Sequence, residues 1–303
     1  MAYHILSIGE CMVELSQAGN GLLKKGFAGD TLNCAWYLRA GLSQGSTIDY
    51  LTCVGDDPLS DEMLAFIEKA GIGTSMIRRI PSRTPGLYLI SLKDGERTFS
   101  YWRDTSAARQ LAEDADHLRR AIDKADLVYF SGITLAILTA SARETLLSEL
   151  RRAKAAGKTI AYDPNIRPRL WEGKATMLDT ISAGARAATM VLPSFDDETT
   201  HFGDANIAET IERYQALGAL QVVVKNGGQG ATVAEGSETI FVPAVPPETV
   251  VDTTSAGDSF NGGLLSRLIE GASLSQAAAH GAAVASVVIS QHGALIDPAL
   301  LPR

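Results

Sequence analysis

Short apolar runs of strand length alternate along the chain with longer segments in which apolar residues recur every three or four positions. The first pattern is typical of buried β-strands and the second of amphipathic helices. The predicted strands span residues 4–9, 48–54, 127–131, 159–163, 190–192 and 221–225, and the predicted helices span residues 58–70, 112–124, 142–156, 174–187 and 205–217. This alternation predicts an α/β fold with a mostly parallel central sheet that helices cover on both faces.

The alternation is interrupted by a β-rich stretch in the first half of the chain. Two runs of strand-like sequence flank Asp94-Gly95, a dipeptide that is typical of hairpin turns. An earlier stretch that ends near residue 28 also has an extended and exposed pattern. We predict that these parts form a small β-strand lid, made of about residues 11–28 and 86–103, on a single domain that spans residues 1–303.

The C-terminal part begins with short strands predicted over residues 232–234 and 239–242. Residues 249–251 are apolar or β-branched, so a further strand is predicted there. A tight turn then leads into a helix whose first turn contains Asp258, and a last helix is predicted over residues 274–290.

Composition and charge narrow the classes of partner. The 303-residue chain is 46% hydrophobic and 20% charged, as expected for a globular protein with a full core. The formal net charge of −8 argues against broad binding to nucleic acid or anionic membranes, because both need a positive surface. We therefore expect neither nucleic acid nor a membrane as a partner.

The cysteines indicate the compartment. Cys11, Cys34 and Cys53 are an odd number and have no C-x-x-C spacing, and the N-terminus has no signal-like apolar run. This usage fits a reducing environment better than a secreted protein with disulfides. We expect a cytoplasmic protein whose cysteines are buried thiols.

Polar side chains gather just after the predicted strands. Ligands of parallel sheets bind beyond the carboxyl ends of the strands, so these side chains are candidates for one site. They are Glu10, Asp30, Asp163, Asn165, Ser194, Asp197, Lys225 and Asp258.

The start of the helix near Asp258 could hold an anion. Unpaired backbone N–H groups at a helix N-terminus attract negative charge, and the small residues Ser255, Ala256 and Gly257 let a phosphate approach closely. An acid in such a cradle has two interpretations. Asp258 either caps the helix or accepts a proton from the group that attacks the phosphate.

Arginines and tyrosines suggest a polyol that carries a carboxylate. Arg167 and Arg169 flank a proline, and the predicted lid contains Tyr88, Tyr101 and Arg103. Arginine forks suit carboxylates, and tyrosine hydroxyls suit sugar oxygens. The alternatives are surface ion pairs for the arginines and hairpin packing for the aromatic rings. No G-x-x-x-x-G-K-[ST] run and no G-x-G-x-x-G after the first strand is present, which argues against P-loop and dinucleotide-binding proteins.

The stretch DTTSAGDSFNGG, residues 252–263, resembles the C-terminal signature of the PfkB, or ribokinase-like, family of carbohydrate kinases. The resemblance extends along the chain and within the family is greatest to kinases of 2-keto-3-deoxygluconate. It is carried by GECM at 9–12, GDTLN at 29–33, PGLY at 85–88, YWR at 101–103, SGITLAIL at 131–138 and RPRLW at 167–171. It implies a ribokinase-like three-layer sandwich with a mostly parallel central sheet and a small β-strand lid.

The resemblance also implies roles for individual residues. Asp258 would be the catalytic base, and Ser255, Ala256 and Gly257 would form an anion hole and contact the nucleotide. The sugar would contact Gly29, Asp30, Asn33, Tyr88, Tyr101, Arg103, Arg167 and Asp258, with the two arginines at its carboxylate end. Ser194, Lys225, Gly227 and Gly230 would line the nucleotide side, and Asp197 would lie near a metal ion. Two positions depart from the family pattern, because Ser194-x-x-Asp197 replaces Asn-x-x-Glu and Ser255 replaces a glycine.

The implied reaction is phosphorylation of 2-keto-3-deoxygluconate to its 6-phosphate by ATP and Mg²⁺, with dependence on a monovalent cation left open. The expected partners are the sugar acid, ATP and further copies of the chain, which would contact one another through the lid. Two alternatives remain at this point: fructokinase or another neutral-sugar kinase of the same family, and a sugar-acid sensor without catalysis.

Overall fold

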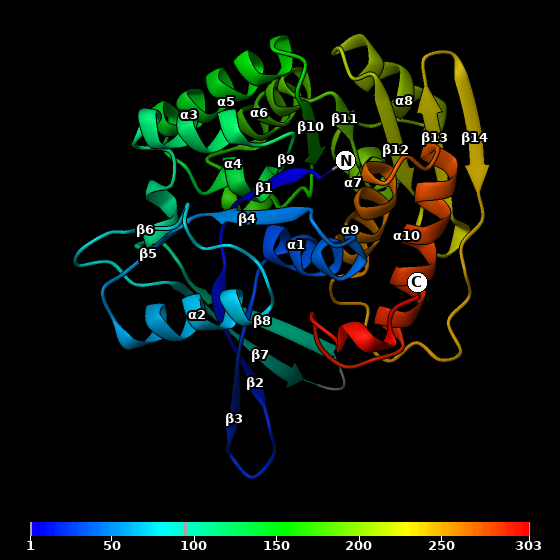
Figure 1. Ribbon diagram of the computed structural model, residues 1–303. Helices are drawn as coiled ribbons and strands as arrows, with labels where there is room; N and C mark the ends of the chain where they lie inside the picture. The colour runs from blue at the N-terminus through cyan, green and yellow to red at the C-terminus, as the bar shows by residue number, and fades with distance from the viewer. Residues whose placement is uncertain (1, 94–95, 303) are drawn as a thin grey trace.

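The computed structural model describes residues 2–93 and 96–302, and an eight-stranded sheet runs through its centre (Figure 1). The strands are β1 (His4–Ile8), β4 (Thr47–Leu51), β9 (Leu127–Ser131), β10 (Thr159–Asp163), β11 (Met190–Val191), β12 (Gln221–Lys225), β13 (Ala231–Glu235) and β14 (Glu238–Val242). Their order is β14-β13-β12-β11-β10-β9-β1-β4. Neighbours are parallel from β4 to β12 and antiparallel from β12 to β14. The predicted mostly parallel sheet is therefore confirmed.

Helices cover both faces of this sheet (Figure 1). One layer contains α3 (Ala115–Lys124), α4 (Gly132–Ala136), α5 (Ala140–Ala155), α6 (Lys174–Ala187), α7 (Phe195–His201) and α8 (Ile207–Ala216). The other contains α1 (Asp30–Gly41), α2 (Pro58–Lys69), α9 (Ala256–Ile269) and α10 (Leu274–Ile289). Short 3₁₀ helices lie at η1 (Ala107–Gln110), η2 (Pro168–Leu170), η3 (Gly227–Gln229) and η4 (Pro298–Leu300).

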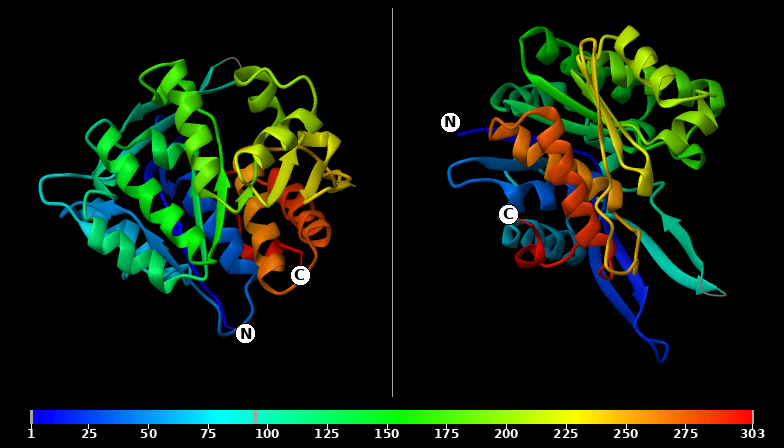
Figure 2. Two further views of the ribbon diagram at one scale, coloured as in Figure 1. Left: turned by 90° about the horizontal axis from the view of Figure 1, so that it is seen from above. Right: turned by 90° about the vertical axis from the view of Figure 1, so that its right-hand side faces the viewer.

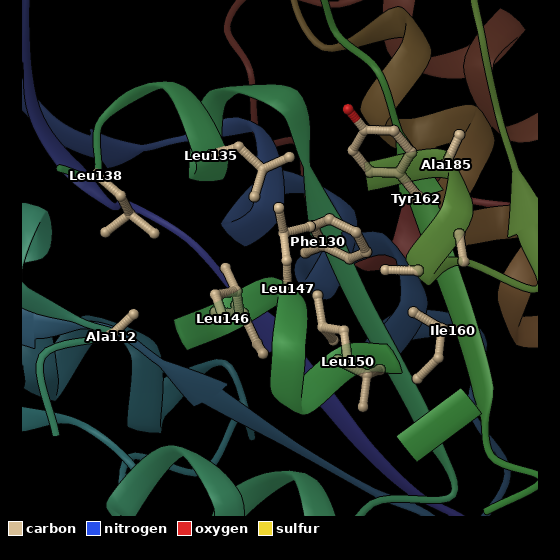
Figure 3. Packing of buried hydrophobic residues seen from close by; sticks show 14 of the residues in the cluster. Ala112, Phe130, Leu135, Leu138, Leu146, Leu147, Leu150, Ile160, Tyr162 and Ala185 are labelled. Atoms are coloured by element: carbon tan, nitrogen blue, oxygen red, sulfur yellow. The ribbon is translucent and has the colours of Figure 1, made fainter. Parts of the chain in front are cut away.

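The alternation of side chains in each strand explains the two layers. In β9, Val128 and Phe130 pack against the α5 layer, whereas Leu127 and Tyr129 pack against the α9 layer. Figure 3 shows Phe130 between Tyr162 and the leucines of α5, and the centroids of the Phe130 and Tyr162 rings are 4.6 Å apart. Burial on both faces requires strands that are apolar throughout, which is the pattern in the sequence. Among the described residues, no helix combines the length and apolar character needed to cross a membrane.

A second sheet extends away from the central one, as the right-hand view of Figure 2 shows. It consists of β2 (Met12–Gln17), β3 (Leu23–Ala28), β7 (Gly86–Lys93) and β8 (Glu96–Trp102), in the order β3-β2-β7-β8. The β2–β7 pair is parallel and the other two are antiparallel. The two stretches predicted as a lid thus form one sheet, whereas the predicted Asp94-Gly95 turn lies outside the described residues.

Three details of the predicted elements are wrong. The early stretch that ends near residue 28 was predicted to be exposed. It is only partly exposed, because Val13 and Phe27 are buried. The strand predicted over residues 48–54 ends at Leu51, and Cys53–Val54 (β5) instead pairs with Arg78–Arg79 (β6) in a separate two-stranded sheet. The strand predicted over residues 249–251 is absent from the described structure. Two prolines precede it, and its Val251 N–H donates to the Ile289 carbonyl at the end of α10 instead of to a strand.

Candidate active site

A cleft of about 820 Å³ opens at the carboxyl ends of the parallel strands and is lined by residues from both sheets. It brings together most of the residues predicted to form a site. These are Gly29, Asp30, Asn33, Tyr88, Tyr101, Arg167, Ser194, Asp197, Lys225, Gly227, Ser255, Ala256, Gly257 and Asp258. The two that line other cavities are Arg103 and Gly230.

The N-terminus of α9 forms one wall of this cleft. Ser255, its N-cap residue, has a left-handed backbone with φ of 65°, which sharply turns the chain into the helix. The Ser255 hydroxyl is buried and has no hydrogen-bond partner among the described residues. The Ala256 N–H reaches the Thr253 carbonyl only at 3.3 Å. An unpaired hydroxyl next to the positive end of a helix is suited to an oxyanion such as a phosphoryl group.

Asp258 lies in the first turn of α9 but does not cap it, because the N-cap residue is Ser255. Its carboxylate accepts a hydrogen bond from Asn33 Nδ2 at 2.9 Å, from the neighbouring helix α1. Burial, and after it the negative charge of Asp30, raises the pKa of Asp258 to about 7. A carboxylate with this pKa can accept a proton near neutral pH and is a stronger base than an exposed aspartate.

The N-terminus of α1 carries the second acid of the cleft. Asp30 Oδ2 accepts a hydrogen bond from Asn165 Nδ2 at 2.8 Å, and burial raises the pKa of Asp30. Gly29 is required here, because a Cβ would lie 2.1 Å from the Glu10 carbonyl oxygen. Asn33, predicted as a sugar contact, lines the cleft; its Nδ2 donates to Asp258, and its Oδ1 accepts from the Gly29 N–H at 3.3 Å.

A buried polar cluster, whose hydrogen bonds are not predicted from the sequence, lies next to the turn at the N-terminus of α9. Lys225 Nζ donates to Asp163 Oδ2 at 2.8 Å and to Asn261 Oδ1 at 3.1 Å. Asn261 Nδ2 also donates to Asp163 at 2.6 Å and to the Tyr129 hydroxyl at 3.2 Å. The cluster joins α9 to β9, β10 and β12. Its only visible signal in the sequence was the position of Asp163 and Lys225 at strand ends.

A second cavity, of about 660 Å³, adjoins the cleft and shares Asp30, Tyr101 and Arg167 with it. Arg103 lines this cavity and is only 7% exposed. Its guanidinium pairs with the buried Glu10 carboxylate, which also accepts from Ser106 Oγ at 2.6 Å. The Arg103 Nε is buried and has no hydrogen-bond partner among the described residues.

The remaining predicted sugar contacts differ in how available they are. Arg167 is 54% exposed and lies 3.8 Å from Asp197, so its charge is open to the cleft. Tyr101 is also exposed. The Tyr88 hydroxyl donates to Glu14, and burial next to that acid raises the pKa of Tyr88. Tyr88 therefore lines the cleft with its hydroxyl already engaged by Glu14.

A third cavity, of about 700 Å³, lies on the other side of the α9 N-terminus. Lys225, Gly227 and Gly230 line it, whereas Ser194, which is also predicted to be on the nucleotide side, lines the main cleft. Phe241, the proline-rich segment 243–247 and small residues of α10 complete its mostly apolar wall. A planar, partly apolar group such as a nucleobase suits this cavity.

Metal ligands are sparse in this site. Within residues 2–93 and 96–302, no group of three or more His, Cys, Asp or Glu side chains is placed to hold a metal ion. Asp197 lines the cleft, where burial raises the pKa of its carboxylate. The donor set therefore fits a hydrated ion carried by the phosphates of a ligand better than an ion bound by the protein alone.

Comparison with known proteins shows which family the chain resembles. Residues 3–299 match the model of the pfkB family of carbohydrate kinases. The 2-dehydro-3-deoxygluconokinase of Dickeya dadantii is 40% identical over 99% of this chain and 98% of its own length. The enzyme of the same name from Escherichia coli is 38% identical over 100% of both chains.

Solved structures agree on the fold. The crystal structure of a fructokinase from Xylella fastidiosa, with bound ATP, matches with a TM-score of 0.85, although only 21% of residues are identical, over 100% of this chain and 96% of that chain. The predicted ribokinase-like fold is thereby confirmed. With a family model that covers almost the whole chain and relatives near 40% identity, the protein belongs to the pfkB family of carbohydrate kinases.

Proposed function

We propose that the protein transfers the γ-phosphoryl group of ATP to the primary hydroxyl of 2-keto-3-deoxygluconate and so forms its 6-phosphate. The observation that carries this proposal is Asp258, a half-buried carboxylate with raised pKa that lines the polar cleft in the first turn of α9, whose N-terminus also lines the apolar cavity. Full-length relatives that carry the name 2-dehydro-3-deoxygluconokinase support the choice of acceptor.

Residues at the start of α9 have separate chemical roles. Asp258 accepts the proton of the attacking hydroxyl, and Asn33 holds its carboxylate in place. The backbone at Ala256 and Gly257, with the unpaired hydroxyl of Ser255, binds the oxygens of the transferring group at the positive end of the helix. Mg²⁺ would neutralise charge on the phosphates, with Asp197 and Ser194 near its hydration shell, and the proposal requires no monovalent cation.

The acceptor would lie with its carboxylate between two arginines. Arg167 brings a charge that is open to the cleft, and Arg103 brings an unpaired N–H in a buried setting. Gly29 and Asp30 lie at the sugar-hydroxyl end, where a backbone without a Cβ allows close approach. The ring of Tyr101 would cover the sugar from the second sheet.

The second sheet would act as a lid and as the contact between copies of the chain. The exposed Trp102 of β8 and the exposed Leu22 and Leu23 near the β2–β3 turn support a homo-oligomer. The three cysteines are free and buried, which is consistent with a cytoplasmic location as part of this proposal.

A panel of acceptors tests the function. ATP consumption is measured with 2-keto-3-deoxygluconate, its galactonate epimer, and neutral hexoses such as fructose. We expect the sugar acid to give a kcat/KM at least about tenfold above any neutral sugar, because a neutral sugar leaves the arginine donors unpaired. Activity confined to neutral sugars would favour the fructokinase alternative. Binding of the sugar acid without any ATP consumption would favour the sensor.

The arginines provide the matched test of the carboxylate contact. Arg167→Gln is expected to raise KM for the sugar acid by about tenfold or more, with a much smaller change for a neutral sugar, because it removes a charged partner of the carboxylate. Arg151→Gln is the control, since Arg151 is an exposed residue of α5 paired with Glu144. Equal effects of Arg167→Gln on both classes of sugar would contradict the carboxylate role.

Activity should also depend on pH in a definite direction. Asp258 must be ionised to accept a proton, so kcat/KM should rise with pH and level off above the Asp258 pKa of about 7. The charged groups that face Asp258 are Asp30, Asp163 and Lys225. Asn33→Ala removes a hydrogen bond that lowers this pKa, so the acid limb should move to higher pH. A midpoint that stays in place in Asn33→Ala would contradict the assignment.

A further inference from the structure

The point where a phosphoryl group would cross from nucleotide to acceptor can be located from the two cavities. The polar cleft and the apolar cavity share five lining residues, Lys225, Gly227, Thr253, Ala256 and Gly257. A group that moves from one cavity to the other must pass these residues. Lys225 alone among them carries a charge, and that charge is positive.

The Lys225 ammonium lies close to the anion-binding turn. A methyl group added at Gly257 would be 3.6 Å from Lys225 Nζ, so the ammonium faces the same space as the helix N-terminus. The side chain is 13% exposed, and this exposed part opens to the two cavities that it lines. A transferring phosphoryl group carries negative charge on three oxygens, which the ammonium could contact together with the α9 backbone.

The neighbours of Lys225 fix the position of this charge. Asp163 and Asn261 each accept one of the three ammonium hydrogens, and Asp163 is itself held by Asn261. One hydrogen remains available for a ligand. The Lys225 N–H also donates to the Pro193 carbonyl at 2.8 Å, so the backbone at this strand end is held as well.

We propose that Lys225 is a catalytic residue that stabilises the transferring phosphoryl group, with Asp163 and Asn261 as its positioning residues. This role rests on the proposed phosphoryl transfer and goes beyond lining the nucleotide side. In the step, the bond from the γ-phosphorus to the ADP oxygen breaks and a bond to the sugar oxygen forms. The hydroxyl proton passes to Asp258, and ADP leaves with the electron pair of the broken bond. The ammonium of Lys225 keeps its proton throughout and offsets the charge on the moving oxygens.

The alternative is an ion pair with Asp163 that serves only to hold the strands together. The two roles differ in what a replacement of Lys225 changes. A structural pair affects the stability of the fold, whereas a catalytic ammonium affects kcat and the binding of transition-state mimics, with little effect on the KM of the sugar.

The test compares Lys225→Met with Lys158→Met. Lys158 precedes β10 at the opposite end of the sheet and donates to the Asp123 and Ala125 carbonyls, so it matches Lys225 as a bonded lysine far from the cleft. We expect Lys225→Met to lower kcat by about 10²-fold with sugar KM nearly unchanged, and Lys158→Met to retain wild-type kcat.

A binding measurement provides a readout that does not depend on turnover or on the acceptor. ADP with Mg²⁺ is titrated calorimetrically with and without aluminium fluoride, which mimics the transferring phosphoryl group. Wild-type protein should bind ADP at least about tenfold more tightly with the fluoride, and Lys225→Met should lose this gain while still binding ADP alone. Unchanged tightening in Lys225→Met would overturn the proposal.

A second variant separates a loss of function from a loss of folding. Lys225→Met leaves the Asp163 carboxylate buried without its cation, and such a charge can unfold a protein. Lys225→Met/Asp163→Asn removes that charge and should fold while still lacking the fluoride effect. Wild-type protein that shows the effect but phosphorylates no sugar acid would refute the proposed acceptor and leave the role of Lys225 supported.

Discussion

Replacement of Asp258 by asparagine is expected to lower turnover by about 10²-fold or more while the protein still folds and binds its substrates. Asparagine has the same shape as aspartate, and its side-chain oxygen can accept the Asn33 Nδ2 hydrogen bond that now measures 2.9 Å. It cannot take up the hydroxyl proton. The loss should therefore appear in kcat, measured with saturating sugar acid and ATP, and KM for both should change little.

The stability of this variant provides an independent check of the Asp258 environment. The folded-state pKa of about 7 lies above the ordinary value of 3.8, so the folded protein prefers the protonated carboxyl. That preference stabilises the fold fully below pH 3.8 and is lost as the pH rises through 7. Because asparagine is neutral at every pH, the Tm of Asp258→Asn relative to wild type should increase between pH 5 and pH 8.

The control for both measurements is Asp179→Asn, at an exposed position of α6 outside the cleft. It should leave kcat unchanged and give no rising Tm difference over the same pH range. Near-normal turnover of Asp258→Asn would remove Asp258 as the base. A Tm difference that stays flat with pH would instead contradict the raised pKa.

The parts of the site that could be predicted from sequence are those made by one continuous stretch. Ser255 to Asp258 are four consecutive residues, so the turn, the helix start and the position of the acid follow from local preferences. Arg103 and Arg167 could be identified as candidates because each lies beside aromatic residues or proline, a combination that a surface loop does not require. The alternation of strands and helices predicts the sheet edge that carries Arg167, whereas Arg103 follows β8 of the second sheet.

The partners of these residues could not be predicted, because they come from distant parts of the chain. Asn33 and Asp258 are 225 positions apart, Glu10 and Arg103 are 93 apart, and Asp163 and Lys225 are 62 apart. Spacing along the chain carries no information on such pairs. This is why neither the hydrogen bond from Asn33 to Asp258 nor the ion pair of Glu10 with Arg103 can be predicted from the sequence.

Errors in the predicted elements have local causes. Helix α4 has only five residues, Gly132–Ala136, which is too short to show a helical period. The apolar run over residues 48–54 looks continuous, yet the chain leaves the central sheet after Leu51 and pairs elsewhere. Apolar character predicts burial, but strands of the central sheet and strand β5 of the two-stranded sheet are both buried. The apolar run therefore does not show which sheet a residue joins.

Gly262→Ala is expected to destabilise the protein and to lower activity together, because Gly262 is where α9 touches α1. A Cβ at this position would lie 2.6 Å from the Cys34 carbonyl oxygen and 2.9 Å from the Leu38 backbone nitrogen. These are backbone atoms of α1, so no side chain can rotate away to make room. The two helices would have to separate, and α1 carries Asn33 while α9 carries Asp258.

The sign of this effect is opposite to the one that helix propensity alone would give. Alanine inside a helix is about 1 kcal/mol more favourable than glycine. Overpacking of a tight contact is unfavourable by about 1–3 kcal/mol, and more where backbone must move. We therefore expect a net loss of stability, a Tm lower by several degrees, and a raised midpoint of the acid limb as Asn33 moves away from Asp258.

Gly173→Ala is the matched control, because Gly173 has an extended backbone and open space where its Cβ would lie. A Gly262→Ala protein as stable and as active as wild type would show that the α1–α9 contact does not position the base.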